Sequence, residues 1–154
     1  MELRFADILH NELLVSAVCS WLIAQVLKLV ISSIKNRSFD ITWLVKDGGM
    51  PSGHSATVSA LAAASALCYG FGSFQFAITT IFAIVVMHDA MGVRLESGKQ
   101  ARAINEVMEY LKSGLFITNI KKLKEVLGHT PLQVIMGSAL GIGIAIVMHY
   151  CIMG

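Results

Sequence analysis

Apolar residues are gathered into four long runs along this chain, with polar or glycine-rich segments between them. The runs cover about residues 13–34, 54–69, 76–91 and 132–152. A helix needs about 20 predominantly apolar residues to cross the hydrocarbon core of a bilayer, and a helix satisfies its backbone polar groups internally. The pattern therefore predicts an all-α integral membrane protein, a four-helix bundle in which residues 1–154 form a single domain.

A different pattern follows the third run. Residues 96–114 place apolar side chains at helical spacing on one face and charged side chains on the other. The apolar face consists of Ala101, Ile104, Val107, Met108 and Leu111. This spacing is typical of an amphipathic helix that lies on the membrane surface. We therefore expect an interfacial helix in addition to the four spans.

Small residues mark the faces on which the spans pack. The second run is crowded with alanine and serine, and the fourth contains the spacing Gly137-x-x-x-Gly141, which lets helix backbones approach closely. Thr130 and Pro131 precede the fourth run as an N-cap and a first helical residue. The small residues of these faces are Ala60, Ala63, Ala64, Gly137 and Gly141. They exceed what one neighbouring helix needs, so we expect a homodimer.

The composition agrees with a membrane environment. Hydrophobic residues make up 55% of the chain and charged residues only 14%, and the mean hydropathy is +0.68. Membrane lipids are therefore expected partners. The formal net charge of +2, without a basic patch interleaved with aromatic residues, excludes nucleic acid. Lys28 is the one charge inside the first run, and it either extends to the interface or faces protein.

Metal and redox chemistry find little support in the sequence. Cys19, Cys68 and Cys151 lie in or at the end of apolar runs without metal-ligand spacing, so we interpret them as small buried hydrophobic residues. The adjacent His88 and Asp89 diverge by about 100° on a helix, and no third ligand has suitable spacing. We expect no metal and no cofactor.

The start of the second run carries the first cluster of polar chemistry. Pro51-Ser52-Gly53-His54-Ser55 stands where a polar loop becomes a helix. The free N–H groups of the first helical turn, the serine hydroxyls and the imidazole then face one small volume, which suits an anion. Lys46, a short loop upstream, adds the positive charge that a phosphate needs in a low dielectric. A helix cap with an interfacial histidine is the alternative that this spacing leaves open.

His129 repeats this arrangement, because it directly precedes the start of the fourth run. If the two helix starts are neighbours, its ring shares the volume of His54. Two histidines suit phosphoryl transfer, since one imidazole attacks phosphorus while the other protonates the leaving oxygen. Taken singly, each is also explained as an interfacial histidine that its neighbours satisfy.

The motifs together resemble a known superfamily. Lys46, Pro51-Ser52-Gly53-His54 and His129-x-x-x-Gln133-Val134-x-x-Gly137 resemble the type 2 phosphatidic acid phosphatase superfamily, which includes lipid phosphatases and vanadium haloperoxidases. Its small divergent branch, labelled acid phosphatase or vanadium haloperoxidase related, is more similar still. That closer resemblance rests on Gly48-Gly49-Met50-Pro51-Ser52, His88-Asp89-Ala90-x-Gly92-Val93-Arg94-x-x-x-Gly98-x-Gln100-Ala101, Asn105 and Leu127-Gly128-His129-Thr130-Pro131, and it covers nearly the whole chain.

The resemblance implies roles for individual residues. His129 takes the nucleophile position, His54 the general-acid position and Lys46 a phosphate-clamp position. Ser52 and Gly53 would supply hydrogen bonds to phosphate oxygens.

Three departures weaken the implied catalysis. No Arg-Pro pair follows Lys46, Leu123 stands where an arginine is expected, and Gln133 replaces the aspartate that orients the nucleophilic ring. A glutamine fixes the tautomer but does not stabilise the imidazolium, so the nucleophilicity of His129 should fall.

Four further residues are candidates to support the site. Arg94 can replace a missing arginine and Asp89 the missing carboxylate, provided that the third span ends beside the two histidines. A structural ion pair at the polar end of the bundle is the alternative for both. Gln100 and Asn105 are supporting candidates, with ordinary positions on a surface helix as their alternative.

The leading hypothesis is a membrane phosphatase that acts on a lipid-linked phosphate monoester or diphosphate through a phosphohistidine on His129. Its alternative is a non-catalytic membrane protein that binds or moves a phosphorylated lipid or solute with the same anion pocket. The clustering of Lys46, His54, Arg94 and His129 at span ends argues against a purely structural subunit.

Basic residues predict the orientation. With four spans, Arg4 and the turn at residues 70–73 share one side, and the two long loops share the other. The long-loop side holds Lys35, Arg37, Lys46, Arg94, Lys99, Arg102, Lys112, Lys121, Lys122 and Lys124. The positive-inside rule therefore predicts a cytoplasmic-membrane protein whose pocket faces the cytoplasm.

Overall fold

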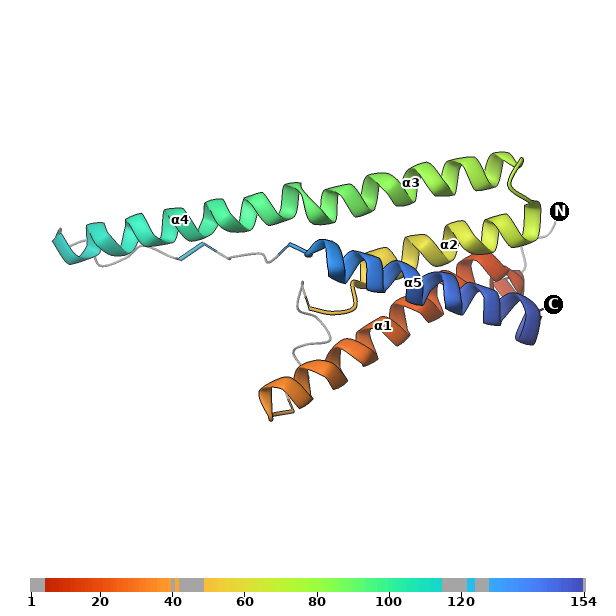
Figure 1. The fold of residues 1–154 in the computed structure, drawn as a ribbon, viewed down its shortest axis with the longest axis horizontal. Helices are drawn as coiled ribbons and strands as arrows, with labels where there is room; N and C mark the ends of the chain where they lie inside the picture. The colour runs from red at the N-terminus through yellow and green to blue at the C-terminus, as the bar shows by residue number, and fades with distance from the viewer. Residues whose placement is uncertain (1–4, 40, 42–48, 115–121, 124–127, 154) are drawn as a thin grey trace.

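The computed structural model describes residues 5–39, 41, 49–114, 122–123 and 128–153, and every regular element among them is helical (Figure 1). In chain order, the elements are η1 (Phe5–His10), α1 (Glu12–Asn36), α2 (Gly53–Tyr69), α3 (Phe74–Met91), α4 (Val93–Gly114), α5 (Pro131–Val147) and η3 (Met148–Met153). Helices thus occupy each of the four apolar runs and the amphipathic segment. The all-α fold class is confirmed.

Each helix of the four apolar runs begins at a side-chain cap. The oxygens of Asn11, Ser52, Ser73 and Thr130 each accept a hydrogen bond from a backbone N–H group of the first turn. Such caps satisfy N–H groups that have no partner within the helix. The helix starts are therefore fixed by local sequence, which places His54 and His129 at defined helix ends.

Three helical stretches among the described residues are long and apolar enough to cross a membrane: Glu12–Asn36, Phe74–Lys112 and Pro131–Ile152. They make the protein an integral membrane protein. The remaining helix, α2, has 17 residues, fewer than the roughly 20 that a full crossing needs.

The short helix α2 lies at the centre of the molecule, where it contacts α1, α3 and α5. Its Ala60 and Ala64 are fully buried against Ala145 of α5. A Cβ atom added at Gly137 would lie 2.4 Å from the Ser52 carbonyl oxygen of α2. The same atom at Gly141 would lie 2.2 Å from the Ala56 carbonyl oxygen. The predicted close-packing face is confirmed, because only glycine fits at either position.

These contacts also change the argument for a homodimer. We inferred it from small residues beyond the need of one neighbour, but Ala60, Ala64, Gly137 and Gly141 are used between α2 and α5 of one chain. The homodimer stays a prediction, and these residues no longer support it.

Small and polar residues face inward, and large apolar residues face outward. The buried face of α1 consists of Ser16, Ala17, Ser20, Ala24, Lys28 and Ser32. By contrast, Leu22 and Val26 of α1 are about half exposed, as are Ile81 of α3 and Ile142 of α5. This distribution is the reverse of a water-soluble core and suits helices whose outer faces contact lipid.

Two of the three cysteines contradict their interpretation as buried residues. Cys68 and Cys151 are exposed, and Cys19 is only partly covered. Their apolar surroundings in the sequence misled the interpretation, because in a membrane protein an apolar run also lines the outer surface.

The amphipathic helix α4 does not lie across the end of the bundle. Figure 1 shows that it continues α3 in nearly the same direction, away from the other helices. Helical hydrogen bonding passes through the junction, since the Gly92 N–H donates to His88 and the Glu96 N–H donates to the Gly92 carbonyl. The apolar Ile104, Val107 and Leu111 are exposed along α4. An interfacial placement of this helix is therefore not confirmed.

Candidate functional site

The start of α2 is a tightly packed turn built on Ser52. The Ser52 hydroxyl oxygen accepts hydrogen bonds from the Ser55 backbone N–H at 3.3 Å and from the Ser55 hydroxyl at 3.0 Å. Ser52, Gly53 and Ser55 are all buried, and Gly53 lies against Trp21 and Gln25 of α1. His54 is only half-buried, so it is the residue of this turn that reaches a cavity.

The start of α5 holds His129 through Gln133. The Gln133 carboxamide oxygen accepts the Thr130 backbone N–H at 3.0 Å and lies 3.3 Å from His129 Nδ1. The Thr130 hydroxyl oxygen in turn accepts a hydrogen bond from the Gln133 backbone N–H, which completes a capping box. Because a carboxamide oxygen only accepts, Nδ1 of a neutral His129 carries the proton and Nε2 keeps its lone pair. Gln133 thus fixes the tautomer that a nucleophilic imidazole requires.

Backbone hydrogen bonds join three helix ends at this site. The Ser52 N–H donates to the Gln133 carbonyl at 3.1 Å, which links the starts of α2 and α5. The His129 N–H donates to the Ala90 carbonyl at 3.0 Å, which adds the end of α3. The condition for bringing Asp89 to the histidines, that α3 ends beside both helix starts, is therefore met.

The two histidines face each other. The ring centroids of His54 and His129 are 5.8 Å apart, and the ring planes meet at 61°. His129 is 6% exposed, so its ring is largely shielded from solvent. The two rings are therefore neighbours in an edge-to-face arrangement.

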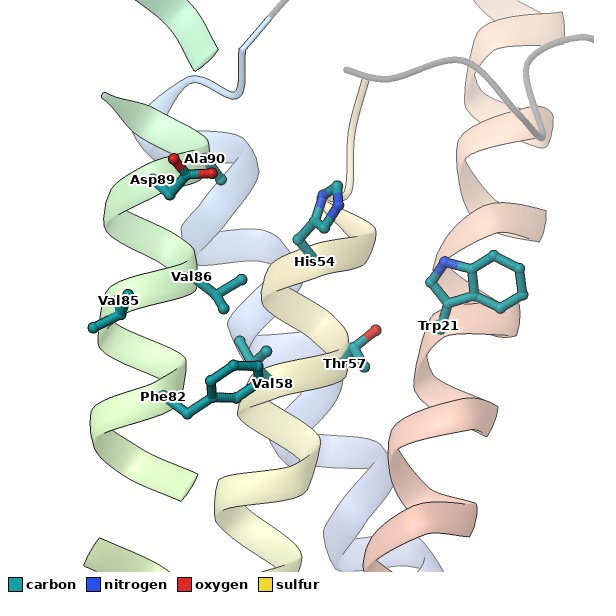
Figure 2. Close-up of a pocket in the computed structure, with 9 residues that line it drawn as sticks. All are labelled: Trp21, His54, Thr57, Val58, Phe82, Val85, Val86, Asp89 and Ala90. Carbon is teal, nitrogen blue, oxygen red and sulfur yellow. The ribbon is translucent and has the colours of Figure 1, made fainter. Parts of the chain in front are cut away.

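A cavity of about 550 Å³ opens beside His54, and Asp89 also lines it. Figure 2 shows both side chains toward one end of the cavity, His54 on α2 and Asp89 on α3, with Val86, Val58 and Phe82 below them. The cavity thus has a polar end formed by an imidazole and a carboxylate and a long apolar wall.

Lys28 is a cation near this site whose role the sequence left open. It is 5% exposed, so its side chain faces protein. A Cβ atom added at Gly49 would lie 3.0 Å from Lys28 Cδ, so the lysine methylenes cross the loop just before Pro51. The ammonium is only two single bonds of about 1.5 Å beyond Cδ. Lys28 also follows Gln25, which lies against Gly53, by one helical turn.

The depth of Lys28 in an apolar run was the signal that could have identified it. A buried lysine in a membrane span is costly and marks a functional candidate by default.

Four predicted site residues remain apart from this cluster or incompletely placed. Lys46 lies outside the described residues. Arg94 is in the first turn of α4, close in sequence to Asp89. Gln100 is exposed on α4. Asn105 is 16 residues beyond Asp89, about 24 Å along a helix, and it binds Leu123 through both its carboxamide atoms, at 2.8 and 3.0 Å.

Comparison with known proteins identifies the family of the chain. Residues 9–144 match the family described as the divergent PAP2 family. The chain belongs to that family. It is also 38% identical over 159 aligned residues to the uncharacterized membrane protein YuiD of Bacillus subtilis (strain 168), an alignment that covers 96% of this chain and 99% of that protein. No solved structure matches the chain significantly.

Membership of the divergent PAP2 family confirms the resemblance that the Pro-Ser-Gly-His and His129 motifs suggested. It suggests a phosphatase-related role. The site residues of this member, however, rest on the geometry described above, because its relative YuiD is itself described as uncharacterized.

Proposed function

We propose that this divergent PAP2 protein is a membrane phosphatase for a lipid-linked phosphate monoester or diphosphate. The observation that carries the proposal is the pairing of His54 and His129, whose ring centroids are 5.8 Å apart at two adjoining helix starts. Each ring has a distinct environment, since His129 is buried and hydrogen-bonded to Gln133 while His54 reaches the cavity. That asymmetry suits one nucleophile and one acid.

In the first step, His129 Nε2 attacks the phosphorus atom as the bond from phosphorus to the lipid oxygen breaks. His54, protonated before the step, gives its proton to that oxygen, so the lipid alcohol, or the lipid monophosphate from a diphosphate, leaves neutral at this oxygen. The Gln133 carboxamide oxygen holds the Nδ1 proton of His129 while the phosphohistidine forms.

In the second step, water attacks the phosphohistidine and gives a proton to His54. The N–P bond breaks, inorganic phosphate forms, and both histidines return to their starting states. These two reaction steps need no metal and no cofactor. Asp89 takes the part of the missing carboxylate, because it lines the cavity with His54 and precedes Ala90, the anchor of His129.

Positive charge for the phosphate comes from Lys28 in this proposal, with Lys46 and Arg94 retained as clamp candidates. The Lys28 side chain crosses the loop immediately before the Pro-Ser-Gly-His turn, and its burial keeps the charge in a low dielectric. An ammonium there strengthens the attraction that the first N–H groups of α2 exert on an anion. Ser52 and Gly53 shape that turn and stay candidates for the same phosphate site, although the Ser52 N–H already donates to the Gln133 carbonyl.

A lipid substrate is favoured by the shape of the cavity. Below His54 and Asp89, apolar side chains of α2 and α3 form its wall (Figure 2). An amphiphile places its phosphate at the polar end and its hydrocarbon chain along Val58, Phe82 and Val86. A soluble phosphate ester gains nothing from that wall.

The alternative is a non-catalytic protein that binds or moves a phosphorylated lipid or solute. Gln133 favours it, because a carboxamide does not stabilise the imidazolium that a strong nucleophile needs. Binding without turnover distinguishes this alternative from the phosphatase.

The proposed topology has four spans, with the shorter α2 held at the centre by α1, α3 and α5. Under that topology the histidine pair and both long loops share the cytoplasmic side of the cytoplasmic membrane. Substrates are then phosphates presented at the inner leaflet.

The test is phosphate release by purified protein in detergent micelles. Phosphatidic acid and a polyprenyl phosphate serve as substrates, and glycerol phosphate as the soluble comparison. We expect release from the lipids, near-complete loss in His129→Ala, and a loss of about 10²–10⁴-fold in His54→Ala. His88→Ala, which removes an exposed histidine of α3, is the matched control and should retain activity.

Two outcomes decide between the candidates. Release that neither histidine substitution lowers would refute the mechanism. Vanadate binding that requires His54 and His129, without release from any substrate, would favour the binding protein instead.

A further inference from the structure

A second cluster of reactive side chains lies at the opposite end of the bundle from the histidine pair. Glu12 belongs to the first turn of α1, Cys68 is the penultimate residue of α2, and His149 lies in η3. One ligand atom from each residue lies within 4.8 Å of the other two. The closest pair, Glu12 Oε1 and His149 Nδ1, is 2.8 Å apart.

The three residue types form a recognised donor set for zinc. Thiolate sulfur, imidazole nitrogen and carboxylate oxygen bind Zn²⁺ at about 2.0–2.3 Å in tetrahedral geometry. Two ligand atoms of such a site are therefore roughly 3.3–3.6 Å apart. The Glu12–His149 separation of 2.8 Å is shorter than this value, and the Cys68 sulfur lies within 4.8 Å of both partner atoms, so the ion needs a slight opening of the Glu12–His149 contact and at most a small approach by Cys68.

The positions of the ligands are fixed before any ion binds. Asn11 caps α1 by accepting the Leu14 N–H at 3.1 Å, which holds the turn that carries Glu12. The Tyr150 ring packs edge-on against His149, with centroids 4.8 Å apart. The side chains of Glu12 and His149 are 14% and 25% exposed and Cys68 is exposed, so an ion can enter from the Cys68 side while the other two ligands stay largely shielded.

Charge balance favours a divalent cation over the bare cluster. A thiolate, a carboxylate and a neutral imidazole carry two negative charges, which one M²⁺ ion neutralises at the edge of a low-dielectric region. The chemistry points to a borderline-soft ion, because hard ions such as Mg²⁺ and Ca²⁺ avoid sulfur.

We propose that Glu12, Cys68 and His149 bind one divalent transition-metal ion of the zinc class, with water as the fourth ligand. The ion fastens the start of α1, the end of α2 and η3 to one another. It is distinct from the proposed phosphate chemistry, whose histidines lie at the other ends of α2 and α5. A Glu12–His149 ion pair with Cys68 as a neighbour is the competing explanation.

The test uses cobalt(II) and zinc(II) with the full-length, reduced protein in detergent. We expect one equivalent of Co²⁺ to give the sulfur-to-cobalt charge-transfer absorption of a thiolate ligand, and Zn²⁺ to displace it. Cys68→Ser should abolish that absorption, and Glu12→Gln and His149→Ala should each weaken Zn²⁺ binding by about 10-fold or more. Zn²⁺ should also raise the thermal midpoint of the wild type but not that of Cys68→Ser.

Cys19→Ser is the matched control, because it removes a thiol of α1 away from the cluster and should keep the full spectrum. The absence of a thiolate band, or a band that survives Cys68→Ser, would overturn the proposal. Retained folding of the variants is checked by their unchanged helical circular dichroism, so a missing band is not mistaken for unfolding.

Discussion

Gln133 joins three groups at the start of α5: the Thr130 N–H, the His129 ring and, through its own carbonyl, the Ser52 N–H of α2. A carboxylate in place of its carboxamide would also accept hydrogen bonds and would in addition stabilise an imidazolium. The glutamine therefore retains the orientation of the ring and gives up its electrostatic support. Within the proposed mechanism, Asp89 is the described carboxylate that offers such support from another helix.

Substitution of Gln133 by leucine tests this positioning role. Gln133→Leu removes the acceptor for His129 Nδ1, so both tautomers become available, and we expect kcat for lipid phosphate to fall by about 10-fold or more. Thr130→Ala is the control, because it removes the cap and spares the histidine contact. It should lower the free energy of unfolding by about 1 kcal/mol and leave kcat nearly unchanged. Equal losses of kcat in both variants would assign Gln133 to helix capping alone.

Replacement of Lys28 tests its charge at the phosphate site. Lys28→Met keeps the apolar stem and removes the ammonium, so we expect vanadate affinity to fall by about 10- to 100-fold, the range of a charge-assisted contact. Lys28→Arg should retain most of the affinity. Lys35→Met removes an exposed lysine of the same helix and should have no effect. Unchanged vanadate affinity in Lys28→Met would remove Lys28 from the site while leaving the histidine mechanism intact.

The sequence predicted some of these residues better than others. His54 and His129 were predictable because each stands beside a capping signal, and a cap fixes where a helix begins. The placement of Lys28 stayed open, because the pattern marks a charge inside a span but does not show whether it extends to the interface or is buried beside the loop at Gly49. Asn105 stays an untested candidate, since its motif position says nothing of the direction that α4 takes.

At the scale of the helices, the approach of α5 to α2 determines the geometry of the site. Gly137 lies against the Ser52 carbonyl and Gly141 against the Ala56 carbonyl, so the two backbones meet along the first turns of α2. Membrane helices associate through such contacts between small residues, because lipid offers no hydrophobic drive for their association. The same contact that stabilises the pair also sets the distance between His54 and His129.

Alanine at Gly137 should therefore disturb both stability and activity. The added Cβ would meet the Ser52 carbonyl oxygen at 2.4 Å, which forces α5 away from α2. We expect Gly137→Ala to lower the free energy of unfolding in detergent by about 1–3 kcal/mol and to reduce vanadate binding. Gly143→Ala is the matched control in the same helix, where a Cβ meets no atom within 4 Å. A Gly137→Ala variant as stable as Gly143→Ala would show that the helices are not in close contact.

Helix α4 shows where prediction from periodicity ends. Its amphipathic spacing indicated a helix, and the structure has one over Val93–Gly114. The spacing says which residues share a face but not how the axis is oriented. The orientation depends on the junction at Gly92, where helical hydrogen bonds continue from α3 into α4. Gly92 alone does not change the direction of the chain between α3 and α4.

At the scale of the whole molecule, the four apolar runs predicted the helical core because lipid requires every span to be apolar along its length. That requirement also explains the weakest part of the prediction. With 17 residues, α2 is short for a crossing, and its contacts with α1, α3 and α5 bury small residues instead of exposing large apolar ones to lipid. In the proposed four-span topology such a helix spans only as part of a bundle, and hydropathy alone does not reveal that.

Orientation in the membrane is the prediction that joins the site to its substrate. The segments that adjoin the histidine pair, α4 among them, carry nearly all the basic residues, so the positive-inside rule predicts that this end of the bundle faces the cytoplasm. The turn between α2 and α3 then faces outward. We expect a cysteine at Gly72, in a variant without the three native cysteines, to react with an impermeant thiol reagent in intact cells.

A cysteine at Ser38, beyond the end of α1, is the second position to be labelled. It should stay unlabelled in intact cells and react after the membrane is permeabilised, because an outward-facing Gly72 puts Ser38 on the inner side. The reverse labelling would place the histidine pair outside and exclude inner-leaflet substrates. Labelling of both positions in intact cells would contradict the crossing of α2, which is the long helix that the described part of the chain places between residues 38 and 72.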